Sequence, residues 1–271
     1  MTTRRDVRYR RTPGVPARDQ SLDLSLPLRP AGCAASPLVV YVHGGGFRAG
    51  DKGRQIADKR ALFTGAGWAF ASINYRLADE STGAADGRYP AAEQDVAGAL
   101  AFLRSRSGPY RTDPDRLLLL GHSAGAFLVS LISTAGRHLE AAGLGLDAVA
   151  CTASVDTSYD IPHEIAQGGQ QAAMFRNAFG NDPAVWRAAS PARNVAAGKD
   201  IPDFHVITRG TPHRVGEAQA FTDSLEAAGV RADLVVARGM SHEDVNDAIG
   251  APGDTRITPA LMAFYRSCGR R

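Results

Sequence analysis

A short glycine-flanked turn constrains this chain more than any other feature. Residues 121–125 read Gly-His-Ser-Ala-Gly. They follow residues 116–120, Arg-Leu-Leu-Leu-Leu, which predict a short buried strand, and lead into a helical pattern that starts at Ala126. A serine framed in this way between a strand and a helix predicts a nucleophile elbow, in which the turn is too tight for side chains at the glycine positions. The turn lifts Ser123 Oγ out of the backbone and directs the amide of Ala124 to the same point. We therefore expect Ser123 to be a catalytic nucleophile.

A second glycine-rich segment follows the apolar, β-branched run 37–42. Residues 43–47 read His-Gly-Gly-Gly-Phe. Glycines let the backbone approach a bound group closely, and an HGGG segment after a strand is typical of an oxyanion hole. We expect the N–H groups of Gly45, Gly46 and Ala124 to hold an oxyanion that develops beside the serine. Loss of one such donor typically costs about 2.7–4 kcal/mol of barrier.

Strands and helices are expected to alternate along most of the chain. Residues 21–26 alternate polar and apolar side chains, which predicts an antiparallel edge strand. Further strands are expected at 38–42, 68–74, 116–120, 148–153, 204–208 and 234–237, and helices at 54–65, 91–106, 215–228 and directly after the elbow. This order predicts an α/β fold with a mostly parallel sheet covered by helices on both faces. Residues 157–200 are irregular, with a short helical stretch at 170–179, and are expected to form an excursion that shapes the substrate pocket.

Composition limits the domain organisation and the partners. Five arginines lie between residues 4 and 11, so we expect 1–20 to be a basic, disordered arm and 21–271 to be one α/β domain. A net charge of +3 is too small to indicate a nucleic-acid partner, and no apolar run is long enough to cross a membrane. The sequence has neither a metal-ligand spacing nor a dinucleotide-binding glycine pattern, so no cofactor or metal is expected. A homodimer stays an open alternative.

The cysteines and the arginine bias suggest where such a chain works. Cys33, Cys151 and Cys268 are odd in number and widely spaced, which predicts reduced thiols in a cytoplasmic protein. Arginine is far more frequent than lysine, and alanine and glycine are abundant. This composition suggests a bacterial source.

The two motifs together resemble the α/β-hydrolase superfamily, and within it the hormone-sensitive-lipase-like and arylformamidase-like esterases. The resemblance covers roughly residues 21–268 and implies an α/β-hydrolase fold. It also implies a catalytic histidine after the last strand, where His242 stands in the segment Arg-Gly-Met-Ser-His-Glu. In that mechanism His242 takes the proton of Ser123 during attack on a carbonyl and then returns it to the leaving group.

The acid position departs from the family pattern. There the loop after the seventh strand reads roughly Gly-x-x-Asp, whereas residues 210–213 read Gly-Thr-Pro-His. His213 carries no negative charge that could stabilise a protonated His242. Glu217 could reach back from the first turn of the next helix, Asp156 could serve from the end of the sixth strand, or no carboxylate is used. These three alternatives stay open, because geometry decides between them.

The intact serine, histidine and glycine loop favour a carboxylesterase-like serine hydrolase that cleaves a small carboxylic ester through an acyl-enzyme. An arylformamidase-like amide hydrolase shares the same motifs. The replacement at His213 favours a different class, a non-hydrolytic lyase or cyclase of a biosynthetic pathway, or a ligand-binding protein that reuses the pocket. The side chains of Phe47, Met174, Phe175 and Phe179 predict a compact pocket and a preference for short acyl chains.

Overall fold

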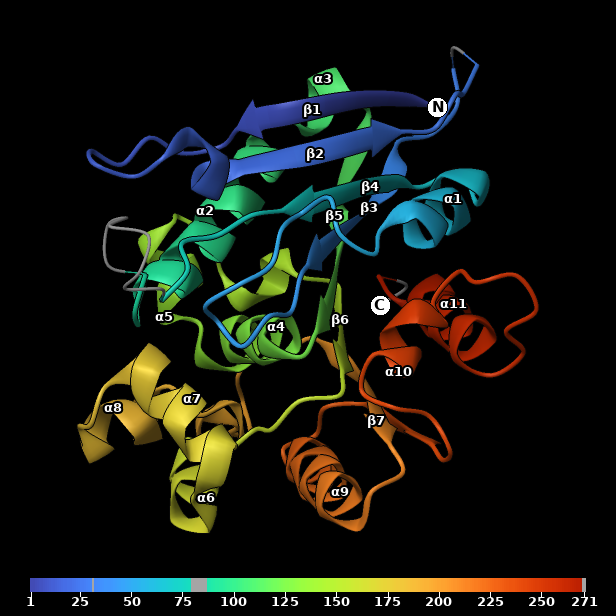
Figure 1. Cartoon of the computed structure of the whole chain (residues 1–271). Coiled ribbons are helices and arrows are strands. Elements are labelled where there is room, and N and C mark those ends of the chain that lie inside the picture. Colours follow the sequence, from blue (N-terminus) through green and yellow to red (C-terminus); the bar gives the residue numbers. More distant parts are fainter. Residues whose placement is uncertain (31, 79–86, 270–271) are drawn as a thin grey trace.

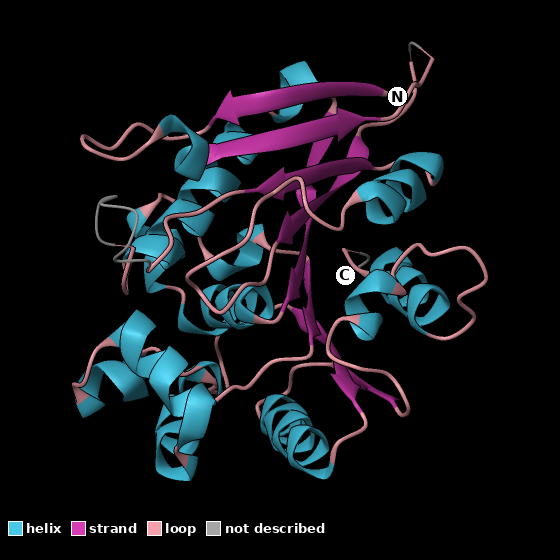
Figure 2. Cartoon of the chain, in the orientation of Figure 1, coloured by secondary structure: helices cyan, strands magenta, loops and turns pink. Residues whose placement is uncertain are grey.

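An eight-stranded sheet runs through the molecule and carries helices on both faces (Figures 1 and 2). The structure is a computed structural model that describes residues 1–30, 32–78 and 87–269. The strands are β1 (Thr2–Arg8), β2 (Ser21–Leu26), β3 (Ser36–Val42), β4 (Ala69–Ile73), β5 (Thr112–His122), β6 (Cys151–Val155), β7 (Asp203–Arg209) and β8 (Ala232–Ala237). Their order is β1-β2-β4-β3-β5-β6-β7-β8; β2 pairs antiparallel with β1 and β4, and all the other pairs are parallel. The expected mostly parallel sheet is confirmed.

Successive side chains of a strand point to opposite faces of the sheet, and helices pack on both faces. The helices are α1 (Ala57–Gly65), α2 (Ala91–Ser105), α3 (Ser107–Tyr110), α4 (Ala124–Ala135), α5 (Arg137–Ala141), α6 (Ile161–Gln167), α7 (Gly169–Phe179), α8 (Pro183–Ala188), α9 (Pro212–Ala227), α10 (Asp244–Asp247) and α11 (Ile257–Ser267). In β3, Val40 and Val42 belong to the core under α2 and α4, whereas Val39 and Tyr41 belong to the core under α1 and α11. Phe204 of β7 packs in a third cluster against α9. β3, which is buried on both faces, therefore reads as a continuous apolar run after Ser36.

The N-terminal residues differ from the expected disordered arm. Residues Thr2–Arg8 form β1, which pairs antiparallel with β2 and makes β1 the edge of the sheet in place of β2. Lys52 Nζ lies 2.7 Å from Asp6 Oδ1 and 2.8 Å from Asp23 Oδ1, so it links the two strands through their side chains. An edge strand needs backbone pairing rather than apolar side chains, which is why the composition of residues 1–20 failed to indicate it.

Two of the three cysteines are joined, so the expectation of reduced thiols is wrong for them. Cys151, at the start of β6, forms a disulfide with Cys268, directly after α11, with a Cα–Cα distance of 6.0 Å. Cys33 is a free thiol. The two partners are 117 residues apart and meet only because α11 packs on the sheet beside β6. The cytoplasmic interpretation rested on reduced thiols and loses that support, since disulfides persist mainly in oxidising compartments.

The excursion at 157–200 contains more regular structure than the sequence indicated. It holds α6, α7 and α8, of which only α7 coincides with the expected stretch at 170–179. In Figure 1 these helices lie together at one end of the sheet, with α9 beside them. Among the residues that the structure describes, no helix has the length and apolar character needed to span a membrane.

Candidate active site

Ser123 lies in a strained turn between β5 and α4. Its φ is 55° and its ψ is −122°, a backbone conformation that non-glycine residues rarely adopt. The two flanking glycines are required by space. A Cβ at Gly121 would lie 2.4 Å from the carbonyl oxygen of Gly125, and a Cβ at Gly125 would lie 2.0 Å from the carbonyl oxygen of Val42. The elbow predicted from the sequence is therefore the local geometry of residues 121–125.

The glycine loop after β3 passes directly against the serine. A Cβ at Gly44 would lie 2.9 Å from the Ser123 Cβ, so glycine is needed for this close approach. Tyr75 Oη donates a 2.9 Å hydrogen bond to the carbonyl oxygen of His43, and the two rings stack with centroids 4.5 Å apart. Gly45 has a φ of +121° and lines a cavity of about 90 Å³ together with Ser123. The structure thus brings together the loop and the elbow from which oxyanion donors were expected.

Of the other two expected donors, Ala124 lines a second cavity at Ser123, and Gly46 lies close to Met174 in the wall of that cavity. Ala124 lines this larger cavity of about 480 Å³ together with Ser123 and His242. A Cβ at Gly46 would lie 3.3 Å from Met174 Sδ, and Met174 lines the same cavity. The serine therefore stands where the two cavities meet.

His242 is held by a buried carboxylate. It follows β8, and its Nδ1 donates a 2.5 Å hydrogen bond to Asp156 Oδ2. Asp156 follows β6, and its side chain has no exposed surface. Its other oxygen accepts from the backbone N–H of Arg209 at 3.0 Å and from Thr208 Oγ1 at 3.3 Å.

These contacts decide the charge of the carboxylate. Burial alone would raise the pKa of Asp156, but its hydrogen bonds from His242 and Arg209, and the charges on both, hold that pKa below its usual value. The aspartate is therefore ionised at neutral pH and keeps the Nδ1–H tautomer of His242, which leaves Nε2 as the basic nitrogen.

His122, the second residue of the elbow, connects the nucleophile turn to the loop of His242. Its Nε2 donates a 2.9 Å hydrogen bond to the carbonyl oxygen of His242, and the two rings lie 4.6 Å apart. Burial, and then the neighbouring His242, lower the pKa of His122 to about 4, so His122 is neutral near pH 7. Sequence reasoning placed His122 in the elbow without a separate role, because the contact spans 120 residues of chain.

The remaining acid candidates make other contacts. His213 lies in the first turn of α9, since the helix begins at Pro212. Glu217 Oε2 accepts a 2.9 Å hydrogen bond from Arg214 and lies 3.2 Å from His213 Nε2. Asp160, a further carboxylate close to Asp156 in the chain, caps α6 and pairs with Arg193. Of the carboxylates named from the sequence, Asp156 is the one that the structure brings to His242.

The large cavity has two kinds of wall. Phe47, Met174 and Phe175 form an apolar side, and Phe179 packs behind them against Phe47 with ring centroids 5.3 Å apart. The polar lining consists of Ser123, Asp156, Thr157, Ser158, Gln170, Gln171, Arg209, Thr211, His213, Arg214 and His242.

A strained serine at a strand–helix turn lines the same cavity as a histidine that a buried carboxylate orients, and this gives the chain the architecture of an α/β-hydrolase. The expectation of that fold is confirmed. The chain belongs to the BD-FAE family, whose model matches residues 22–199.

Similar proteins carry esterase names. The chain is 28% identical over 204 residues to the esterase LipQ of Mycobacterium tuberculosis. The matched region covers 72% of this chain and 47% of LipQ. It is 26% identical over 243 residues to the esterase LipI of the same organism, covering 86% of this chain and 73% of LipI. A truncated carbohydrate esterase from gut microbiota has the same fold, with a TM-score of 0.78 at 20% identity over 98% of this chain and 95% of that one. The chain thus spans about half the length of LipQ.

Proposed function

We propose that the protein is a serine hydrolase that cleaves a small carboxylic ester through an acyl-enzyme. The observation that carries this proposal is the 2.5 Å contact between His242 Nδ1 and Asp156 Oδ2, in a cavity that Ser123 also lines. A histidine oriented by a carboxylate next to a serine on an elbow is the arrangement that activates a hydroxyl for acyl transfer. The names of LipQ, LipI and the carbohydrate esterase favour an ester as the substrate.

In this mechanism His242 Nε2 takes the hydroxyl proton while Ser123 Oγ forms a bond to the carbonyl carbon. Asp156 stabilises the imidazolium, and the N–H groups of Gly45, Gly46 and Ala124 stabilise the oxyanion. Collapse of the tetrahedral intermediate breaks the bond to the alcohol oxygen, which receives the proton from His242. Water then repeats the cycle on the acyl-serine and releases the acid.

We assign the two halves of the ester to the two cavities that meet at Ser123. His242 lines the larger cavity, and it must protonate the departing oxygen, so the alcohol belongs in the 480 Å³ cavity. The acyl group then lies in the 90 Å³ cavity beside Gly45. This assignment supports a short acyl chain.

The non-hydrolytic alternatives, a lyase, a cyclase or a ligand-binding protein, were motivated by the histidine at position 213. That motivation is weaker because Asp156, at the end of β6, supplies a carboxylate that is hydrogen-bonded to His242. An arylformamidase-like amide hydrolase would use the same groups, and no contact of the described residues favours an amide over an ester.

Ser123→Ala tests the proposal directly. We expect it to abolish cleavage of p-nitrophenyl acetate and labelling by a fluorophosphonate probe, because no other hydroxyl stands on an elbow beside His242 in the part of the chain that the structure describes. Thermal unfolding should match the parent, since alanine fits the space of the serine. Turnover retained by purified Ser123→Ala protein would exclude the acyl-enzyme mechanism.

A further inference from the structure

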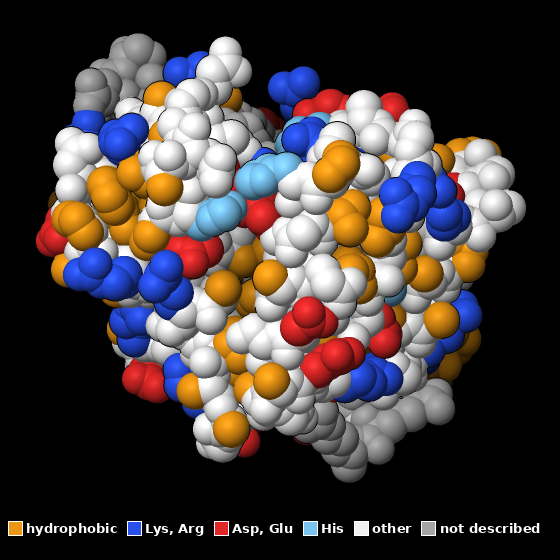
Figure 3. Space-filling view, turned by 90° about the horizontal axis from the view of Figure 1, so that it is seen from below, with side chains coloured by type: hydrophobic (Ala, Val, Ile, Leu, Met, Phe, Trp, Pro, Cys, Tyr) orange, Lys and Arg blue, Asp and Glu red, His pale blue; other side chains and the backbone are white. Residues whose placement is uncertain are grey.

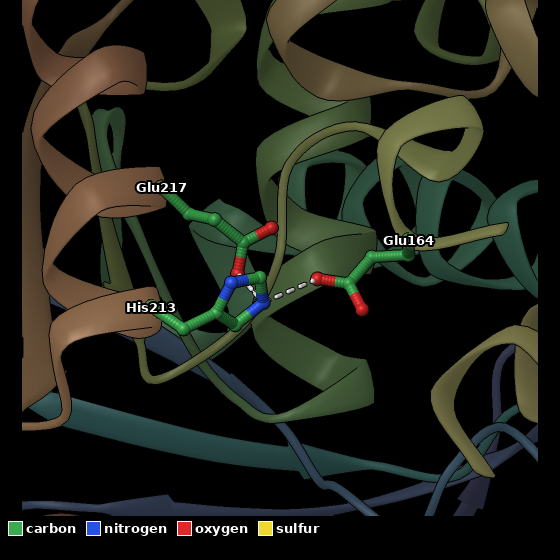
Figure 4. Close-up of side chains that lie close together, drawn as sticks. All are labelled: Glu164, His213 and Glu217. Carbon is green, nitrogen blue, oxygen red and sulfur yellow. Dashed lines mark hydrogen bonds and ion pairs between the residues drawn. The ribbon is translucent and has the colours of Figure 1, made fainter. Parts of the chain in front are cut away.

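Three side chains of metal-ligating type converge between α6 and α9, outside the Ser123–His242–Asp156 site (Figure 4). Glu164 comes from α6, and His213 and Glu217 come from one face of α9, four residues apart. His213 Nε2 lies 3.1 Å from Glu164 Oε1 and 3.2 Å from Glu217 Oε2. We propose that Glu164, His213 and Glu217 bind a divalent transition-metal ion of the zinc type.

The spacing of the three ligand atoms fits such an ion. Zinc binds histidine nitrogen and carboxylate oxygen at about 2.0–2.2 Å, so two ligands of a tetrahedral site lie about 3.3 Å apart. The two nitrogen–oxygen distances of 3.1 and 3.2 Å are close to that separation, and all three ligand atoms lie within 4.8 Å of one another. An ion between the three ligand atoms therefore needs little movement of the side chains.

Burial and charge also favour a cation at this point. The side chains of Glu164 and Glu217 are 2% and 8% exposed, so two carboxylates face each other away from water. Arg214 is the arginine that lies against both carboxylates. One guanidinium balances one of the two carboxylate charges, and a divalent ion between them supplies the rest.

Arg214 is compatible with an ion beside it. Its Nη1 donates to Glu217 Oε2 at 2.9 Å and lies 3.8 Å from Glu164 Oε1. It also donates to Ser158 Oγ, and Ser158 Oγ in turn donates to Glu164 Oε1 at 2.9 Å. Ligand carboxylates are commonly oriented by such outer hydrogen bonds, which use lone pairs that the metal leaves free.

The cluster borders two cavities, through which an ion could reach it, and one of them is the catalytic cavity. His213 lines both the catalytic cavity and a neighbouring cavity of about 450 Å³, and Glu217 lines the second one. In Figure 3, histidine side chains lie next to acidic ones on this lower face of the molecule. The ion would join α6, which precedes the cavity-lining helix α7, to α9, and so hold one wall of the catalytic cavity in place. This inference does not depend on ester hydrolysis.

Zinc binding to the metal-free full chain tests the inference. In isothermal titration calorimetry with ZnCl₂ near pH 7.5 we expect one saturable site, and thermal unfolding should shift upward when zinc is present. Cobalt(II) in place of zinc should give the intense visible absorption of a four-coordinate ion. Glu164→Gln and His213→Ala should each weaken zinc binding by about 100-fold or more, since changes of outer-shell partners alone cost about 10–100-fold.

Two histidine variants serve as matched controls. His163 stacks on His213 with ring centroids 5.9 Å apart but lies outside the cluster, so His163→Ala should bind zinc like the parent. His242→Ala should also bind zinc like the parent, which separates this site from the catalytic histidine.

Two results would overturn the assignment. Absence of saturable binding by the folded parent would show that the cluster is only an ion-pair network. Loss of binding in His242→Ala with retention in Glu164→Gln would place the ion at the catalytic site. Glu164→Gln preserves the shape of the side chain, so the test stands even where His213→Ala folds poorly.

Discussion

Replacement of Asp156 by asparagine is the sharpest test of the proposed catalytic arrangement. The carboxylate accepts hydrogen bonds from His242 Nδ1 at 2.5 Å, from the backbone N–H of Arg209 at 3.0 Å and from Thr208 Oγ1 at 3.3 Å. An asparagine side chain offers a single acceptor oxygen, and the backbone N–H of Arg209 is fixed in place by β7. In Asp156→Asn we therefore expect the amide oxygen to face Arg209 and the NH₂ group to face His242. That orientation moves the ring proton from Nδ1 to Nε2, so His242 can no longer accept the proton of Ser123.

The size of the loss follows from this tautomer change. In chymotrypsin-like serine proteases, the same aspartate-to-asparagine change lowers turnover about 10⁴-fold, and we expect a loss of about 10²–10⁴ in kcat/KM here. The corresponding barrier increase is about 2.7–5.4 kcal/mol. The assay is kcat/KM on p-nitrophenyl acetate for the parent and for Asp156→Asn, with circular dichroism to confirm the fold.

Glu217→Gln is the matched control, because it replaces the other carboxylate that the sequence offered as the acid by an amide. With a chelator present to keep divalent ions away, it should remain close to the parent in kcat/KM, since the contacts of Glu217 go to Arg214 and His213. A kcat/KM for Asp156→Asn within about tenfold of the parent would refute the reasoning, because a change below about 1.4 kcal/mol is too small for the loss of an essential acid.

Three further results are expected. Short acyl chains should be preferred, because the cavity assigned to the acyl group measures about 90 Å³; faster cleavage of p-nitrophenyl dodecanoate than of the butyrate in parallel assays would contradict this. His213→Asp should leave kcat/KM nearly unchanged, because His213 contacts Glu164 and Glu217 rather than His242; a clear gain in ester turnover would mean that position 213 still serves as the acid site. Burial lowers the pKa of His205 to about 4, so the unfolded chain binds more protons than the folded chain between about pH 6.5 and 4, and stability is lost as the pH falls through that range. Relative to His205→Gln, the parent should lose about 2 kcal/mol of unfolding free energy between pH 8 and pH 5 in urea titrations, and a constant difference would argue against a neutral buried imidazole.

The sequence predicted the nucleophile turn because its requirements are local. Gly121 and Gly125 both lie in the turn, which has no room for a side chain at either position. The sequence pattern indicates the apolar strand before them and the helix after them. The position of His242 was inferred from its place after the last strand. Ser123 and His242 line the same cavity, which agrees with that expectation.

The acid could not be selected from the sequence because the choice depends on three-dimensional register. Asp156 and Glu217 were both plausible in chain order, and only the parallel pairing of β6 with β7 brings the N–H of Arg209 to the Asp156 carboxylate. The same limit applies to β1, whose pairing with β2 is a backbone property, and to the contact between Cys151 and Cys268. Each depends on partners that are distant in sequence.

The disulfide between Cys151 and Cys268 has a consequence for the covalent integrity of the active site. It closes a loop with a sequence separation of 117 residues, and this loop contains His242 and Asp156, whereas Ser123 precedes it. A protease that cuts anywhere within the loop therefore leaves two polypeptides that stay linked to each other. Under oxidising conditions the nicked protein keeps its nucleophile and its base in one covalent molecule, and only reduction allows the two pieces to separate.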